Sequence, residues 1–368
     1  MIGAIVDYVL AADDAAAAAQ IADPDIAILS LTVTEAGYSF DVPNATFNAI
    51  ARGLDERRAA GAGPLTILSC DNLPGNGTVA RAATMAACEG RGADLARWVD
   101  ASCTFPISMV DRITPVTSES DRDWLRDTWG ISDAWPVVAE PFRQWVIEDK
   151  FAAGRPRWED VGALFTDRVH DWELYKLRML NAAHSCMAYL SALAGITFVD
   201  EAMAEPVVRR FLERLLYEEA IPTLTEIPGH LRTDYAASVL GRFTNTGVRD
   251  QIARLCIDGT AKFPTFLIPT IDRQLELDGP IDSAALALAG WARYLAVTPK
   301  AARAADGSGD LAAAHAERAL RDPAAFLEFG EVFPPALARN ERFRTAFATA
   351  AERLSARGPL GALAEYAV

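Results

Sequence analysis

The segment KLRMLNAAHS (176–185) places side chains capable of acid–base chemistry on an otherwise apolar helix. The chain has 35 Lys and Arg residues but only four lysines, one of which is Lys176. Arginine keeps its proton near neutral pH, whereas a buried lysine can lose it. At about 100° per residue, an α-helix brings Glu173, Lys176, Asn181 and His184 within about 140° of one face. A carboxylate, an amine, an amide and an imidazole on one face predict the wall of an active site.

A purely structural interpretation of the same residues is also open. A single lysine on a helix usually reaches solvent with its charged end. A single helical histidine is more often a core residue with satisfied hydrogen bonds than a catalyst. Four polar groups lie on one face, and two of them belong to residue types that are rare in this chain. The functional and the structural interpretation are therefore about equally supported.

Composition predicts an ordered, two-domain protein of the cytoplasm. The 368 residues, of which 51% are hydrophobic, suffice for two cores. A net charge of −15 argues against nucleic acid or an anionic membrane as partner. The N-terminal stretch has no basic signal-peptide region, and no apolar run reaches the ~20 residues of a membrane span. Five cysteines without a CxxC pair suit a reducing compartment, and the four histidines lack zinc-ligand spacing, so we expect no metal.

The chain divides near residue 165, and the part before it has an α/β pattern. Short β-rich runs alternate there with helical stretches, which indicates a largely parallel sheet. The runs are two strands at 26–35 and 65–72, an amphipathic helix at 79–100, and a third strand beginning at 135 in the segment 135–149.

After residue 170 the strand pattern fades and helical periodicity takes over. Proline and glycine separate successive helical stretches, so this part is predicted to be all-helical. A loop is expected at 304–310, where the sequence reads AADGSGD. The helical stretches are 198–224, 235–245, 248–264, 284–297, 323–333 and 340–358.

Polar residues follow the predicted strands, at the edge of the sheet where parallel sheets bind ligands. Thr34 and Glu35 follow the first strand, and Asp71 and Asn72 follow the second. Asn72 also fits an ordinary turn, because SCDNLPGNG is rich in turn-forming residues. Asp111, in TFPISMVDRITP, fits either a functional role or a structural ion pair with the arginine after it.

Five segments of the chain resemble, in order, the hallmark segments of the long-chain mannitol dehydrogenase family. The resemblance implies a partial Rossmann-type cofactor domain over 1–165 and an all-helical substrate domain over 166–368, with the site in the cleft between them. It also implies a metal-independent oxidoreductase that uses NAD, with NADP as the alternative, and acts on a polyol or a hexuronate. The segments are LTVTEAGY, SCDNLPGNG, SMVDRITP, EPFRQWVIEDKFAAGRPRWE and KLRMLNAAHSCMAYL.

The resemblance also implies a role for each matched polar residue. Lys176 is the general base, Asn72 and Asn181 form the oxyanion site, and His184 hydrogen-bonds the substrate. A buried, neutral lysine can take the alcohol proton, and each amide donor to the developing alkoxide is typically worth about 10²–10³ in rate. The remaining predicted contacts are Asp111, Arg254 and Lys262 for substrate, and Thr34 and Glu35 for cofactor.

One feature departs from the family pattern. Family members begin with a βαβ unit that carries a glycine-rich phosphate loop, and the glycine pairs of this chain do not join a strand to a helix in the GxGxxG manner. We therefore expect the cofactor domain to lack its first βαβ unit, as in an N-terminally truncated member. The glycine pairs lie at 61–63, 75–77, 90–92 and 307–309.

Three functions follow from these patterns. The first is a polyol dehydrogenase of the mannitol–fructose type. The second is a reductase of fructuronate or tagaturonate, in which Arg254 and Lys262 clamp the substrate carboxylate. The third is an inactive truncated fragment that persists as a folding or interaction module.

Overall fold

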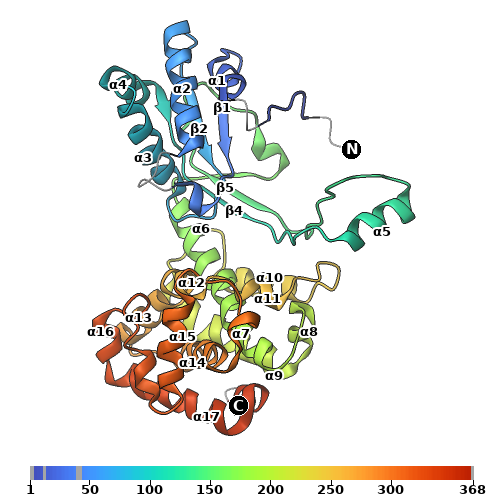
Figure 1. The fold of residues 1–368 in the computed structure, drawn as a ribbon, viewed down its shortest axis with the longest axis vertical. Helices are drawn as coiled ribbons and strands as arrows, with labels where there is room; N and C mark the ends of the chain where they lie inside the picture. Colours follow the sequence, from blue (N-terminus) through green and yellow to red (C-terminus); the bar gives the residue numbers. More distant parts are fainter. Residues whose placement is uncertain (1–3, 11–13, 39–43, 366–368) are drawn as a thin grey trace. The chain divides into compact units, whose positions relative to one another are not determined.

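The computed structural model describes residues 4–10, 14–38 and 44–365. Its internal contacts divide the chain into two units, Met1–Arg112 with Arg143–Glu173, and Ile113–Phe142 with Leu174–Val368. All the strands found in the described residues belong to the first unit, and the second is helical (Figure 1). The predicted fold class, an α/β part followed by a helical part, is confirmed.

The first sheet is parallel, with strand order β1-β2-β3. Leu29 of β1 pairs with Ile67 of β2, and all five residues of β2 are buried. Both predicted strands end earlier than expected, where the chain turns into polar loops. The strands are β1 (Ile28–Leu31), β2 (Leu65–Ser69) and β3 (Cys103–Thr104).

Four helices accompany this sheet (Figure 1). Phe47 and Leu54 share a buried core with Leu65 and Val99. The single helix predicted at 79–100 is wrong, because the chain breaks at Gly92, whose φ of 143° few other residues adopt. The helices are α1 (Asp14–Ala22), α2 (Ala45–Ala60), α3 (Asn76–Glu89) and α4 (Ala93–Ser102).

A second, mixed sheet completes the first unit. β4 (Ser108–Asp111) pairs antiparallel with β5 (Gln144–Ile147), and β5 pairs parallel with β6 (Leu164–Phe165). The strand predicted to begin at residue 135 forms only at β5. Pro136 and Pro141 precede it and have no N–H to donate to a sheet. A 3-10 helix (Trp158–Val161) lies before β6, and α6 (Val169–Tyr175) follows it.

The helical unit is organised around α14 (Asp282–Val297). This helix is apolar on all sides, and residues 283–292 are all buried, as expected of a central core helix. It packs against α7, α15 and α17. A Cβ on Gly290 would lie 2.7 Å from Cδ2 of Leu190 in α7, so the glycine permits this close approach. Since α7 follows the KLRMLN segment, α14 supports the helix that carries the candidate residues.

Most remaining helices of this unit fall within the predicted stretches, with more breaks than expected, whereas α5, α13 and α15 lie outside them. The loop predicted at 304–310 is confirmed over residues 304–308, and α15 begins directly after it. None of the helices among the described residues is long and apolar enough to cross a membrane. The helices are α5 (Glu119–Trp129), α7 (Ala182–Leu193), α8 (Val199–Ala204), α9 (Pro206–Arg214), α10 (Arg232–Phe243), α11 (Ile252–Leu255), α12 (Gly259–Phe266), α13 (Ile268–Glu276), α15 (Gly309–Ala319), α16 (Pro335–Arg339) and α17 (Glu341–Glu365), with π-helices at Lys176–Asn181 and Leu215–Ala220 and 3-10 helices at Ile221–Thr223, Lys300–Ala302 and Pro323–Phe326.

Candidate active site

Asp71 fixes the loop that follows β1. Its carboxylate accepts hydrogen bonds from the backbone N–H of Val33 (3.1 Å) and of Thr34 (2.8 Å), and from the hydroxyl of Tyr38 (2.6 Å). Burial and this carboxylate raise the pKa of Tyr38, so the phenol keeps its proton and remains a donor. The side chain after β2 thus holds the loop after β1 at the carboxyl ends of two adjacent parallel strands.

The same loop contains a strained residue. Thr34 has a φ of 63°, which a β-branched residue adopts at a cost of about 1–3 kcal/mol. Strained residues persist where the surrounding structure holds them, and they cluster at ligand sites. Glu35 follows at the start of a 3-10 helix (Glu35–Tyr38). These two predicted cofactor residues therefore lie at the sheet edge where dinucleotides bind in such folds.

Asn76 joins the ends of the two sheets. Its amide nitrogen donates to the carbonyl oxygens of Ser69 (3.1 Å) and Ser108 (2.7 Å), and its oxygen accepts from Ser108 N–H (2.9 Å). The predicted residues Asn72 and Asp111 lie nearby in sequence, Asn72 exposed in the turn after β2 and Asp111 buried at the end of β4. Sequence analysis missed Asn76 because it lies in the turn-rich segment PGNG, which indicates no tertiary partner.

The KLRMLN segment is a π-helix, not an α-helix, and the prediction of a continuous α-helix is wrong there. The N–H of Ala182 bonds to the carbonyl of Leu177, five residues earlier. The extra residue per turn shifts the later side chains, so the common face calculated at 100° per residue does not hold. Arg178 anchors the segment by donating to the carbonyl oxygen of Thr223 (3.1 Å). Short π-helical segments of this kind are frequent at functional sites.

The candidate residues of this segment fall within the helical unit. Lys176 begins the π-helix and is buried, with 9% of its surface exposed. Asn181 ends it and is half-buried, and its side-chain amide makes no hydrogen bond to other described residues. Glu173, predicted for the same face, belongs to the first unit, where its carboxylate accepts from Gly75 N–H (2.9 Å).

His184 has a buried nitrogen without a partner. Within the described residues, its Nε2 has no hydrogen bond, and its ring stacks on Phe243 with centroids 4.1 Å apart. Burial, followed by the charge of Arg254, lowers the pKa of His184 well below 6.5. The imidazole is therefore neutral at pH 7, and its unsatisfied nitrogen can bind an oxygen of a ligand.

Three cations of the helical unit, Arg254, Arg242 and Lys262, lie close enough to lower the pKa of His184. Arg254 pairs with Asp250 through two hydrogen bonds, the first from Nε to Oδ1 at 2.7 Å and the second from Nη2 to Oδ2. Lys262 donates to the carbonyl oxygen of Leu255 (3.2 Å). Burial and the nearby guanidinium of Arg254 lower the pKa of Lys262, so its ammonium loses a proton more readily than that of an exposed lysine. Asp250 was not among the predicted site residues, although its spacing of four from Arg254 indicates a helical pair.

The predicted residues divide between the two units. Those of the first unit follow strands, and those of the second lie on or after the π-helix. Thr34, Glu35, Asn72 and Asp111 belong to the first unit, and Lys176, Asn181, His184, Arg254 and Lys262 to the second.

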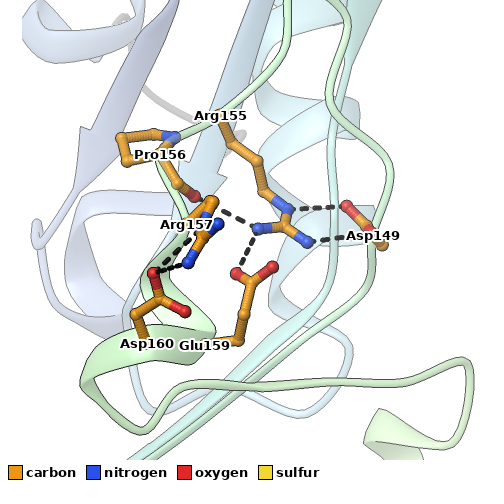
Figure 2. Close-up of polar contacts among 6 residues, drawn as sticks. All are labelled: Asp149, Arg155, Pro156, Arg157, Glu159 and Asp160. Atoms are coloured by element: carbon orange, nitrogen blue, oxygen red, sulfur yellow. Dashed lines mark hydrogen bonds and ion pairs between the residues drawn. The ribbon is translucent and has the colours of Figure 1, made fainter.

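The segment DKFAAGRPRWE is held by Arg155 (Figure 2). Its guanidinium donates to both oxygens of Asp149 (2.7 and 3.0 Å) and to Glu159 (2.7 Å), and it lies 3.3 Å from the ring centroid of Phe165 in β6. The hydrogen bonds from Arg155 lower the pKa of Asp149 below its usual range. This cluster fixes the connection between β5 and β6, so its role is structural.

The cysteines are all free thiols, and four of the five are buried. Among the described residues, no three His, Cys, Asp or Glu side chains are grouped so that they could hold a metal ion.

Two sequence models together match most of the chain. The mannitol dehydrogenase Rossmann domain matches residues 1–160, and the mannitol dehydrogenase C-terminal domain matches residues 168–355. The chain belongs to the mannitol dehydrogenase family. Mannitol 2-dehydrogenase of Phaeosphaeria nodorum is 37% identical, over 100% of this chain and 69% of its own length. Mannitol dehydrogenase DSF1 of Saccharomyces cerevisiae is 36% identical, over 99% of this chain and 78% of its own length.

Two solved structures of similar proteins have the same fold. A ternary complex of Pseudomonas fluorescens mannitol 2-dehydrogenase with NAD and D-mannitol superposes with a TM-score of 0.86 at 38% identity, covering 99% of this chain and 79% of that one. A substrate-free D-sorbitol dehydrogenase gives a TM-score of 0.88 at 32% identity, covering 98% of this chain and 80% of that one.

Proposed function

We propose that this member of the mannitol dehydrogenase family is a metal-independent oxidoreductase that transfers hydride between NAD and a secondary alcohol of a polyol, of the mannitol–fructose type. Family membership and the similarity to a mannitol 2-dehydrogenase that binds NAD and D-mannitol support the reaction and the cofactor. Localisation in the cytoplasm, expected from the cysteine pattern, stays a prediction.

The observation that carries the proposal is the buried Nε2 of His184, which has no hydrogen bond within the described residues. A buried polar atom without a partner costs about 1–3 kcal/mol, so it is normally satisfied by a ligand or a water molecule. A substrate hydroxyl can supply the missing partner. The half-buried amide of Asn181, the residue immediately before α7, offers a further donor from the same stretch of chain.

The chain's own residues can carry the proton chemistry. In alcohol oxidation, Lys176, which is buried at the start of the π-helix, takes the proton of the reacting hydroxyl. Asn72, Asn181 and His184 donate to the oxygen as it becomes an alkoxide. NAD, when bound, accepts the hydride. Asp111, Arg254 and Lys262 hold the other hydroxyl groups of the substrate.

The fit to NAD rests on the loop that Asp71 holds. Thr34 and Glu35 lie at the carboxyl ends of adjacent parallel strands, and the strain at Thr34 is maintained by two backbone hydrogen bonds to that carboxylate. This arrangement suits the approach of a dinucleotide to the backbone.

The proposal is tested by replacing Lys176. Purified chain is assayed for fructose reduction with NADH and for mannitol oxidation with NAD, and Lys176→Ala is expected to lower turnover by at least about 10³, because a positioned base contributes about 10²–10⁴. Lys176→Arg should be nearly as damaging, since guanidinium keeps its proton.

Lys300 provides a matched control, because its exposed side chain only pairs with Asp310. Lys300→Ala should leave turnover unchanged. Wild-type-like turnover in Lys176→Ala would contradict the assignment of the base, and wild-type chain inactive on both substrates would contradict the proposed function.

A further inference from the structure

One hydrogen-bonding edge of the Arg254 guanidinium is occupied by Asp250, and its Nη1 end is open. Asp250 takes the Nε and Nη2 side, which is one of the two edges through which a guanidinium can pair with a carboxylate at two points. Within the described residues, Nη1 makes no hydrogen bond. Arg254 also lines a cavity of about 560 Å³ in the helical unit, together with Asp250 and Gln251. The arginine can therefore donate to a ligand through its Nη1 end, while its positive charge is already balanced by Asp250.

Asp250 is fixed in this position by its own surroundings. Only 4% of its surface is exposed, and its backbone carbonyl accepts from Val199 N–H (2.9 Å). The next residue, Gln251, forms a β-bridge with Phe198. A buried carboxylate that already accepts both bonds from an arginine cannot move aside without leaving a charge unpaired, which is costly.

We propose that Asp250 is a specificity-determining residue, which reserves Arg254 for neutral polyols and ketoses and rejects sugar acids. The inference rests on the proposed function. A substrate carboxylate near Arg254 would meet the negative charge of Asp250 and a guanidinium whose positive charge Asp250 already balances. A hydroxyl group needs only the single donor that Nη1 offers, and it carries no charge for Asp250 to repel.

Lys262 does not compensate for the occupied arginine. Its ammonium donates to the carbonyl oxygen of Leu255, and burial favours its neutral form. The pair of cations that would clamp a hexuronate is thus reduced to an arginine whose charge Asp250 balances and a lysine that already donates to a backbone carbonyl oxygen. The charge of Asp250 and the contact of Lys262 both favour a neutral substrate over a sugar acid.

The test compares fructose with fructuronate, which differ by a carboxylate at the far end, in NADH-dependent reduction. Asp250→Asn is expected to raise the ratio of kcat/KM for fructuronate over that for fructose by about tenfold or more, because the variant removes the negative charge that balances the guanidinium and repels a carboxylate. For fructose itself, KM should rise more than kcat falls, since Asp250 orients Arg254 and does not touch the reacting carbon. Asp250→Glu, which keeps the charge, should retain most of the wild-type ratio.

Two controls separate this role from a structural one. Glu213→Gln breaks a pair of the same spacing, between Arg209 and Glu213 on α9, and should leave the ratio unchanged. In an Arg254→Met background, Asp250→Asn should no longer raise the ratio, because the guanidinium that it frees is absent.

An Asp250→Asn variant that folds and reduces fructose with an unchanged ratio would overturn the proposal. A rise in the ratio that persists without Arg254 would also overturn it. If Asp250→Asn does not fold, Asp250→Glu and Arg254→Met decide, and a wild-type ratio in Arg254→Met would refute the role of the pair. Wild-type chain that reduces neither sugar would instead reject the proposed function.

Discussion

Replacing His184 with phenylalanine should separate stability from activity. Phenylalanine keeps a ring against Phe243, where the centroids now lie 4.1 Å apart, and removes the buried Nε2 that has no partner among the described residues. Removing an unsatisfied buried polar atom relieves a cost of about 1–3 kcal/mol. We therefore expect His184→Phe to unfold at a higher urea concentration than the wild-type chain at pH 7.5.

The pH dependence of this gain is set by the lowered pKa of His184. Because the folded pKa lies well below 6.5, the unfolded state binds a proton near pH 6.5 and the folded state does not. Above pH 6.5 the ring is neutral in both states, so protonation does not affect the free energy of unfolding. As pH falls below 6.5, the unfolded state gains a proton that the folded state does not, and the free energy of unfolding decreases. Between pH 7.5 and 5.5 the wild-type chain should lose about 1.4 kcal/mol relative to His184→Phe, which is 2.3RT for one pH unit below the unfolded pKa.

The assay is urea unfolding followed by tryptophan fluorescence at the two pH values. The other three histidines are present in both proteins, so their titration cancels in the difference. Activity moves in the opposite direction, since loss of one donor to the reacting oxygen lowers kcat/KM by about 10²–10³. A stability difference that is equal at both pH values, or a fully active variant, would refute the reasoning.

Three further perturbations test other parts of the structure. Asp71→Asn should weaken NADH binding at least about tenfold in calorimetric titration, because the loop at Thr34 loses one of the two acceptors of its backbone donors and an amide NH2 takes its place; unchanged binding would exclude this loop from the cofactor site. Burial raises the pKa of Glu219 to about 7, above the usual 4.5, so its contribution to stability is lost as pH rises from about 4.5 to 7. In urea unfolding, the free energy of unfolding of the wild-type chain should fall by on the order of 3 kcal/mol over that range, and Glu219→Gln should remove this fall. An unaltered pH profile in the variant would contradict this. Gly259→Ala should destabilise the chain by about 1–3 kcal/mol, because the new Cβ would lie 2.3 Å from the hydroxyl oxygen of Tyr189; an unshifted unfolding midpoint would show that the site can relax.

Local patterns in the sequence were enough to predict the fold class and the segment that carries the candidate base. Alternation of apolar runs with helical stretches predicts the parallel sheet, since side-chain periodicity depends on near neighbours. Lys176, Asn181 and His184 attract attention because their types are unusual on an apolar helix. The ends of the strands were predicted only approximately, since β1 and β2 end at Leu31 and Ser69, before the predicted ends at 35 and 72.

Partners distant in sequence were decided only by the tertiary structure. The N–H of Thr34 bonds to a carboxylate 37 residues away, and Asn76 reaches Ser108, 32 residues away. No local pattern predicts such hydrogen bonds, because they depend on which strands lie side by side. The π-helix that begins at Lys176 was not predicted, for a related reason. The same residues fit an α-helix equally well, and packing against the rest of the unit selects between the two.

The pair of Asp250 and Arg254 shows where the boundary between the two kinds of information lies. Their spacing of four residues is visible in the sequence and is typical of an exposed helical ion pair. Burial of Asp250 to 4% exposure turns that pair into a fixed constraint on the arginine. The chain's residue types determine which chemistry is available, and the packing around each group determines which of its donors, acceptors and charges remain for a ligand.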